Sequence, residues 1–247
     1  MDNHIGIEFM RLTKYENLEP SPQSLGVPMP PLQVPLDEGS VPLPLPDGRN
    51  LLLEKLDLAD LVDRRETLRK YSVHSLSLQE LAFLLWGTQG VKTYSEKQLT
   101  RRTVPSAGSR HPFETTLLVN RVDGLEPGLY RYLAIEHQLA RLRAQENIRD
   151  QLTEACLKQK HVSNSAVTFA WVAVPQRTAW RYSQRAYRYL LLDAGHVCQN
   201  LYLLAEAIGC GVCAIAAYND DLVNQALGLD GMEQFVIYMA SLGRRAS

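Results

Sequence analysis

The chain has 247 residues, enough for one sizeable domain with its own hydrophobic core or for two small domains. A formal net charge of −1 gives no basic surplus for nucleic acid, and no apolar run has the length that crosses a membrane. The first residues lack the basic and apolar regions of a signal peptide, so we expect a cytoplasmic protein.

The first 49 residues differ in composition from the rest, because they contain nine of the thirteen prolines. Proline removes a backbone donor and fixes φ, so this stretch cannot form a helix or a central strand. We predict an extended N-terminal arm over residues 1–49, followed by one domain over residues 50–247. Leucines and valines between the prolines indicate that the arm lies along a surface, either its own or a partner's.

In the first half of the domain, a helical pattern begins near Leu51. A second helix starts at the capping box formed by Ser77 and Glu80 and ends at Gly87 and Gly90. A strand pattern covers residues 115–119. Residues 129–133 and 139–142 are typical of the two arms of a hairpin.

In the second half, residues 147–160 have the spacing of an amphipathic helix and residues 166–174 that of a buried central strand. A long helix is predicted from Ala179 to Ile208, with Gly209 at its C-terminal cap. A strand at residues 212–217, a helix at 220–227 capped by Asn219 and a strand at 235–242 complete the chain. We therefore expect an α+β domain with helices packed around a mixed, mostly antiparallel central sheet.

Cys210 and Cys213 form a C-x-x-C pair, which is found in redox dithiols and in zinc sites. No second pair of Cys or His ligands follows at zinc spacing. We therefore interpret the cysteines as small buried hydrophobic residues and expect no metal site.

Three segments carry chemistry-bearing residues in a recognisable order: residues 64–71 (RRETLRKY), residues 103–112 (TVPSAGSRHP), and residues 181–201 together with Leu242-Gly243-Arg244. In this order and spacing the chain resembles the SagB-type dehydrogenases of the nitroreductase superfamily, over about residues 50–244. The resemblance implies a nitroreductase-like fold, FMN as cofactor and a homodimer with FMN at the subunit interface.

FMN carries a phosphate dianion, a polyol chain and an electron-poor ring, and guanidinium groups match phosphate oxygens well. By resemblance, Arg65, Thr67 and Arg69 contact the phosphate, the ribityl chain and the pyrimidine side of the ring, and Arg244 is a second phosphate ligand. The small-residue loop of Pro105, Ser106, Ala107, Gly108 and Ser109 lets a backbone approach the flat ring, and in the family it comes from the partner subunit. Ala216 stands where the family often has glycine.

Tyr182 is the predicted acid/base residue, because family members that oxidise azolines have a Lys-Tyr pair at this point. Here the pair is Arg181-Tyr182. Arginine stays protonated and is a poor general base, but its charge favours an ionised tyrosine.

The resulting hypothesis is an FMN-dependent oxidoreductase that transfers hydride between flavin N5 and a small molecule or a heterocycle-containing peptide. One alternative is an NAD(P)H-dependent nitro or quinone reductase. The other is a non-catalytic flavin-binding scaffold partner of a peptide-modifying complex. No G-x-G-x-x-G fingerprint precedes a helix, so we expect no Rossmann domain.

Overall fold

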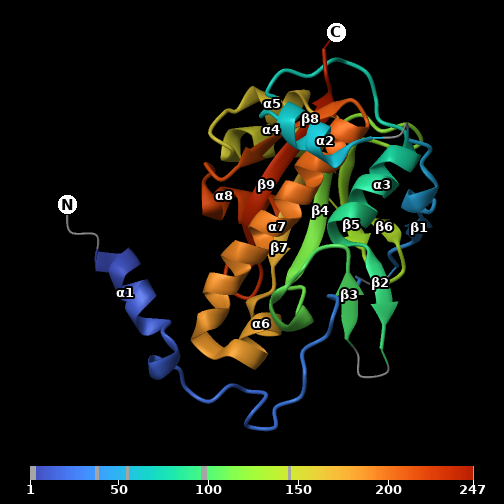
Figure 1. The fold of residues 1–247 in the computed structure, drawn as a ribbon. Coiled ribbons are helices and arrows are strands. Elements are labelled where there is room, and N and C mark those ends of the chain that lie inside the picture. Colours follow the sequence, from blue (N-terminus) through green and yellow to red (C-terminus); the bar gives the residue numbers. More distant parts are fainter. Residues whose placement is uncertain (1–3, 37–38, 54–55, 96–98, 144–145, 247) are drawn as a thin grey trace.

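The computed structural model describes residues 4–36, 39–53, 56–95, 99–143 and 146–246. Seven strands form one sheet in the order β1-β6-β5-β4-β7-β9-β8, and every pairing in it is antiparallel (Figure 1). These strands are β1 (Pro42–Pro44), β4 (Phe113–Val119), β5 (Gly128–Leu133), β6 (Gln138–Arg141), β7 (Val167–Ala173), β8 (Cys210–Ile215) and β9 (Phe235–Arg244). The mostly antiparallel α+β sheet predicted from the sequence is confirmed.

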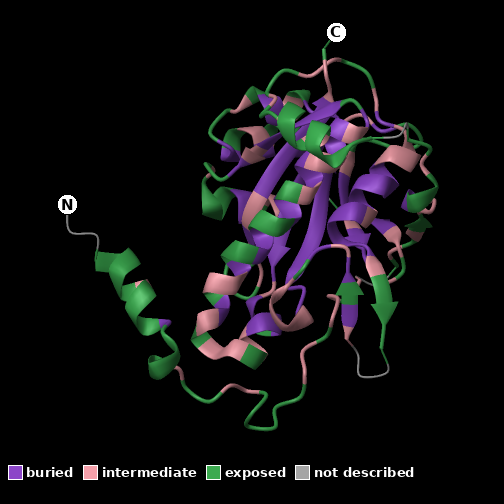
Figure 2. Ribbon diagram, in the orientation of Figure 1, coloured by how far each residue is buried: buried purple, intermediate pink, exposed green. Residues whose placement is uncertain are grey.

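Helices cover both faces of this sheet, because side chains alternate between two hydrophobic cores along the central strands. In β7, Phe169 and Trp171 face the core shared with α3 (Leu78–Gln89) and α7 (Ala186–Ala207). Ala170 and Val172 face the smaller core shared with α4 (Ile148–Ala155) and α8 (Asp220–Leu227). Because β4 and β7 are buried on both faces, they form the centre of the molecule (Figure 2).

The remaining elements lie around this body. They are the helices α1 (His4–Leu12), α2 (Leu58–Arg64), α5 (Lys160–Asn164) and α6 (Pro175–Tyr182), the strands β2 (Val91–Tyr94) and β3 (Thr100–Arg102), which pair with each other, and the 3-10 turns η1 (Tyr15–Asn17), η2 (Gly48–Asn50), η3 (Ala107–Ser109) and η4 (Ser183–Arg185). Among the described helices, none is both long and apolar enough to cross a membrane.

Local sequence signals placed several elements correctly. Ser77 accepts a hydrogen bond from the amide of Glu80, whose carboxylate accepts one from the amide of Ser77, so the predicted capping box starts α3. Asn219 caps α8 as predicted, and Gly209 has a left-handed φ of 67° directly after α7. The four cysteines are free and buried, as expected.

Three expected elements were wrong in their extent. The helix expected near Leu51 begins only at Leu58, after Asp57 caps it; residues 54 and 55 lie outside the described residues. The helix predicted over 147–160 ends at Ala155, because Leu157 and Lys158 have left-handed φ angles. The helix predicted over 179–208 is two helices, because Ser183 has a φ of 50° and turns the chain between α6 and α7.

The proline-rich arm lies along the surface of its own chain. The carbonyl of Trp180 accepts from the Gln23 amide at 2.8 Å, and the indole of Trp180 donates to the carbonyl of Val27 at 2.7 Å. Further along, the amide of Val34 donates to the buried carboxylate of Glu114 at 2.8 Å. Finally, β1 pairs with β6, so the end of the arm supplies an edge strand to the main sheet. By contrast, none of the residues of α1 is buried (Figure 2). The helix contacts the body at Arg188 of α7, whose guanidinium donates to the carbonyl of Met10 and lies 6.0 Å from the centre of the Phe9 ring.

Candidate functional site

The segment that holds Arg65, Thr67 and Arg69 follows α2 and runs beside β8, the edge strand of the sheet. Thr67 forms a parallel bridge with Val212, and the amide of Leu68 donates to the carbonyl of Val212 at 2.9 Å. A Cβ atom on Gly211 would lie 2.5 Å from the side chain of Leu68, so the close approach of this segment requires glycine there. Arg65, Thr67 and Arg69 therefore all lie in the short segment that runs beside the edge strand β8.

Tyr202 of α7 connects this segment to β8. Its hydroxyl bonds to the hydroxyl of Thr67 at 3.2 Å and accepts from the amide of Ala214 at 3.0 Å. The guanidinium of Arg65 lies 5.5 Å from the centre of the Tyr202 ring, within the range of a cation–π contact. Arg65, Thr67 and Tyr202 are thus brought together beside β8.

Arg69 is exposed and lies near His161 and Cys213. Burial lowers the pKa of His161, and the charge of Arg69 lowers it further. Burial raises the pKa of Cys213, and the charge of Arg69 opposes that rise. Among the described carboxylates, none forms an ion pair with Arg65 or with Arg69. Their charges are therefore available to an anionic ligand.

Unlike Arg65 and Arg69, Arg244 is paired with a carboxylate, although the resemblance predicts that all three contact the same cofactor. Its guanidinium donates to both carboxylate oxygens of Glu80, at 2.6 and 2.7 Å, and to the carbonyl of Ile208 at 2.9 Å. It thereby ties the end of β9 to the capping box of α3. Ala216, also predicted to contact the cofactor, is exposed just beyond the end of β8.

The small-residue loop lies at another part of α7, where it is held by a buried carboxylate. Asp193 accepts from the hydroxyl of Ser106 at 2.6 Å and from the amide of Ala107 at 3.3 Å. The hydroxyl of Ser106 also accepts from the amide of His111 at 2.9 Å. Burial raises the pKa of Asp193, and the hydrogen bonds from Ser106 and Ala107 oppose that rise. The position of the loop is therefore fixed by hydrogen bonds to α7.

The predicted catalytic pair at the end of α6 touches this loop. Gly108 has a left-handed φ of 58°, and a Cβ atom there would lie 2.7 Å from the hydroxyl oxygen of Tyr182 and 3.0 Å from Cδ of Arg181. The guanidinium of Arg181 lies 5.8 Å from the centre of the Tyr182 ring, and the ring of Tyr189 packs against the same ring, at 4.7 Å between ring centres. Arg181, Tyr182 and residues 105–109 thus form one group.

The predicted site residues therefore form two groups within one chain (Figure 1). The first contacts α7 at Tyr202, and the second contacts it at Asp193, nine residues earlier. At 1.5 Å and 100° per residue, these points are about 13 Å apart along α7 and about half a turn apart around it. The two groups lie on opposite flanks of the helix.

Two residues that organise these groups were not predicted as site residues, Tyr202 and Asp193. Asp193 could have been noticed in the sequence, because an acidic residue there interrupts the apolar periodicity of the long helix. Tyr202 could not have been picked out from the sequence, because a tyrosine on an apolar helix is most often part of the core. Within the described ranges, no cluster of three or more His, Cys, Asp or Glu side chains could hold a metal ion.

Comparison with known proteins agrees with this architecture. The pattern of the Nitroreductase family matches residues 62–244. A provisionally named nitroreductase of Methanocaldococcus jannaschii is 31% identical over 193 residues, covering 78% of this chain and 93% of the relative. The trifolitoxin-processing protein TfxB of Rhizobium leguminosarum bv. trifolii is 28% identical over 160 residues, which are 61% of this chain and 43% of TfxB.

Solved structures give the same result. A provisionally named nitroreductase from Anabaena variabilis is 32% identical with a TM-score of 0.65, covering 77% of this chain and 38% of that protein. The chain therefore spans less than half the length of this protein and of TfxB. The Escherichia coli microcin synthetase McbBCD complex shares the fold over 98% of this chain and 93% of the matched chain, with a TM-score of 0.62 at 19% identity. The sequence and fold matches agree, and the chain belongs to the nitroreductase family of oxidoreductases.

Proposed function

We propose that the protein is an FMN-dependent oxidoreductase that transfers hydride between an organic substrate and the flavin, with each FMN bound between two copies of the chain. When bound, FMN supplies a two-electron acceptor at N5 of its ring. The substrate range that we favour is a small molecule or a heterocycle-containing peptide, in line with the SagB-type resemblance of the sequence.

The first group of residues suits the phosphate end of FMN. Arg65 and Arg69 have no carboxylate partner among the described residues, and a phosphate dianion is a strong acceptor for guanidinium groups. Thr67 places a hydroxyl between them. Arg244 is less available, since Glu80 and the carbonyl of Ile208 already occupy three of its five N–H groups.

The observation that carries the proposal is the separation of the two groups on opposite flanks of α7. Two copies of the chain can supply one group each to a single FMN, which would bring the two groups together without requiring one FMN to reach around α7 in its own chain. The outer face of α7 also exposes Leu191 and Leu192, each 59% accessible, and such apolar side chains suit burial against a second copy.

The second group would handle protons at the reacting end. Tyr182 has a hydroxyl that can donate or accept a proton, and the contact with Gly108 holds it at the loop. Arginine is a poor general base, so the role of Arg181 is to place a positive charge beside the Tyr182 ring, 5.8 Å from its centre.

Two alternatives have support from relatives. TfxB is named for trifolitoxin processing and the McbBCD complex is a microcin synthetase, which favours a peptide substrate or a scaffold role in a peptide-modifying complex. The NADPH:FMN oxidoreductase of Vibrio harveyi shares the fold, with a TM-score of 0.55 at 14% identity, and its name describes reduction by NADPH. An NAD(P)H-dependent nitro or quinone reductase is therefore the second candidate function.

The first experiment is the visible spectrum of the purified protein, with the released cofactor identified by mass. We expect about one FMN per chain, and a double variant R65A/R69A without flavin. The control R64A/K70A removes two neighbouring exposed charges and should keep its FMN. A colourless protein that takes up no added FMN would contradict the enzyme proposal and favour a scaffold that has lost the cofactor.

A heterodimer distinguishes shared from single-chain sites. One chain carries R65A/R69A and the other carries a bulky G108L substitution in the loop, and two affinity tags select the mixed dimer. Shared sites leave one intact site per heterodimer, so we expect about one FMN per dimer, while either homodimer binds none. Absence of FMN from the heterodimer as well would show that each chain builds its own site.

A further inference from the structure

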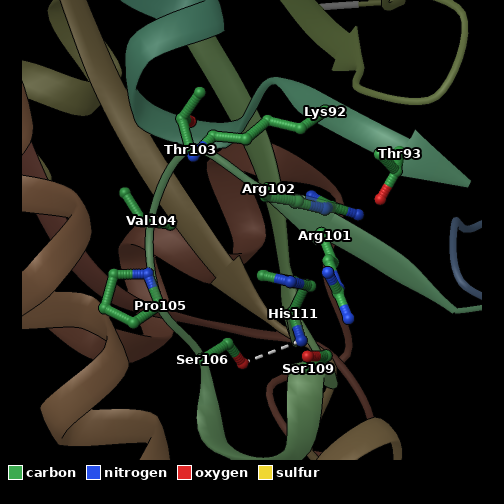
Figure 3. Close-up of a pocket in the computed structure, with 10 residues that line it drawn as sticks. All are labelled: Lys92, Thr93, Arg101, Arg102, Thr103, Val104, Pro105, Ser106, Ser109 and His111. Atoms are coloured by element: carbon green, nitrogen blue, oxygen red, sulfur yellow. Dashed lines mark hydrogen bonds between the residues drawn. The ribbon is translucent and has the colours of Figure 1, made fainter.

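A basic pocket of about 660 Å³ lies beside the small-residue loop (Figure 3). Its walls come from β2, from β3 and from the segment that runs from β3 into the loop. The lining residues are Lys92, Thr93, Arg101, Arg102, Thr103, Val104, Pro105, Ser106, Ser109 and His111. Three of them are cations, Lys92, Arg101 and Arg102, and none is acidic.

The deepest of these cations, Arg102, is only 7% exposed and has no charged partner of its own. It donates to the neutral side chain of Gln89 at 3.0 Å, and its Nε has no hydrogen-bond acceptor. The carboxylate that acts on it is Glu114, which forms a buried ion pair with Arg177. One buried carboxylate thus lies near two buried guanidinium groups, so one of the two positive charges is left unbalanced at the base of the pocket.

This excess charge persists at neutral pH. Burial lowers the pKa of Arg102 only to about 10, so the guanidinium stays protonated. Burial, together with the charge of Arg102, lowers the pKa of His111 to about 3, so the imidazole stays neutral. The charge of the pocket therefore comes from Lys92, Arg101 and Arg102. Among the described side chains, none forms a salt bridge with any of the three.

We propose that this pocket binds the phosphate group of a molecule that reacts at the neighbouring loop. A phosphate monoester carries a charge of roughly −1.5 to −2 at neutral pH, which three cations can balance. Arginine binds phosphate through paired N–H groups and lysine as a point charge, and the structure offers both. The volume also suits an organic ligand rather than an ion alone. That the molecule reacts at the loop rests on the function proposed above, whereas phosphate binding itself does not.

Two sources could provide the phosphate: a nicotinamide dinucleotide phosphate or a phosphorylated organic substrate. In both cases Pro105, Ser106 and Ser109, which belong to the loop that we assign to the flavin, also line the pocket. A phosphate held by Lys92 and Arg101 would therefore fix one end of the ligand while its other end reaches the loop.

The test is isothermal titration of inorganic phosphate into the full chain. Lys92 and Arg101 are exposed, so the double variant K92Q/R101Q should fold, whereas Arg102 is buried and a substitution there could unfold the protein. The control R143Q/K160Q also removes two exposed charges, and neither residue lines the pocket. We expect phosphate affinity to fall roughly tenfold or more in K92Q/R101Q, the loss of at least one charge-assisted hydrogen bond, and to stay unchanged in the control.

Equal phosphate affinity in the wild type and in K92Q/R101Q would overturn the proposal. The visible spectrum of each variant gives its FMN content, which tests the flavin proposal independently of phosphate binding. A variant can therefore contradict one proposal without contradicting the other. Titration with NADP⁺ and NAD⁺ then identifies the source. A preference for NADP⁺ that K92Q/R101Q loses supports the dinucleotide, and intact phosphate binding without that preference supports a phosphorylated substrate.

Discussion

Arginines in two regions of the molecule differ in whether a carboxylate pairs with them. Where the arm meets the body, Arg177 is 3% exposed and pairs with the buried carboxylate of Glu114, and its Nε donates to the carbonyl of Pro31 at 2.9 Å. Beside β8, Arg65 and Arg69 carry the same charge without a carboxylate partner among the described residues. An arginine with a buried carboxylate partner holds elements together, whereas the half-buried Arg65 and the exposed Arg69, which lack such a partner, are available to a ligand.

The difference follows from the cost of burying charge. A buried ion that loses its partner cannot be solvated, so paired arginines should matter for folding. An exposed arginine costs little to remove, so its loss should appear in binding instead. The free energy of unfolding distinguishes these two kinds of arginine.

Replacing Glu114 by Gln should have the largest effect. The variant keeps an acceptor for the amide of Val34 but leaves Arg177 and Arg102 as buried cations without a carboxylate. We expect the free energy of unfolding to fall by about 3–5 kcal/mol, measured by urea denaturation. The exposed control E126Q should stay within about 0.5 kcal/mol of the wild type. A loss below about 1 kcal/mol in E114Q would show that the pair does not hold the arm to the body.

His111 should make stability depend on pH, because burial and the charge of Arg102 lower its pKa to about 3 and keep it neutral in the folded state. The unfolded chain protonates this histidine near pH 6.5, so its contribution is complete above that pH and is lost as the pH falls toward 3. Between pH 6.5 and 5 we expect a loss of about 2 kcal/mol that H111N does not show. Urea denaturation at the two pH values measures it, with the exposed His74→Asn as control. An identical pH dependence in H111N and the wild type would exclude this origin.

Gly108 and Gly124 offer a matched pair of substitutions in left-handed backbone, with φ angles of 58° and 83°. A Cβ atom on Gly124 meets nothing within 4 Å, so G124A should cost only the backbone strain, about 1 kcal/mol. G108A adds a clash with the hydroxyl of Tyr182 and should cost about 2 kcal/mol. Equal unfolding free energies for the two variants would mean that Tyr182 moves aside freely and that the loop does not position it.

The smallest effect on folding is expected for R65A/R69A in protein stripped of flavin. These side chains lose one cation–π contact and no ion pair, so the free energy of unfolding should change by about 0.5 kcal/mol. Thermal or urea unfolding of the stripped protein measures it. A loss above about 2 kcal/mol would place Arg65 and Arg69 with the structural arginines and weaken their assignment to a ligand.

The elements predicted correctly are those with a local physical signal. The capping box at Ser77 and Glu80 and the apolar run of β7 depend on neighbouring residues alone. The long helix was predicted without its break, because the left-handed turn at Ser183 is not required by its residue type. The α6–α7 corner that brings Tyr182 to the loop was therefore invisible in the periodicity.

The class of fold and the residue types proposed for the site can be recognised in the sequence alone. Arginine, threonine and small residues in a fixed order carry that information, because a phosphate and a flat ring, the parts of the proposed cofactor, restrict which side chains suit them. Which of these residues meet depends on the tertiary structure. Ion pairs such as Arg244 with Glu80 join residues far apart in the chain, and α7 places the two groups of site residues on opposite flanks. Local sequence cannot encode such pairings, since each depends on how distant elements pack.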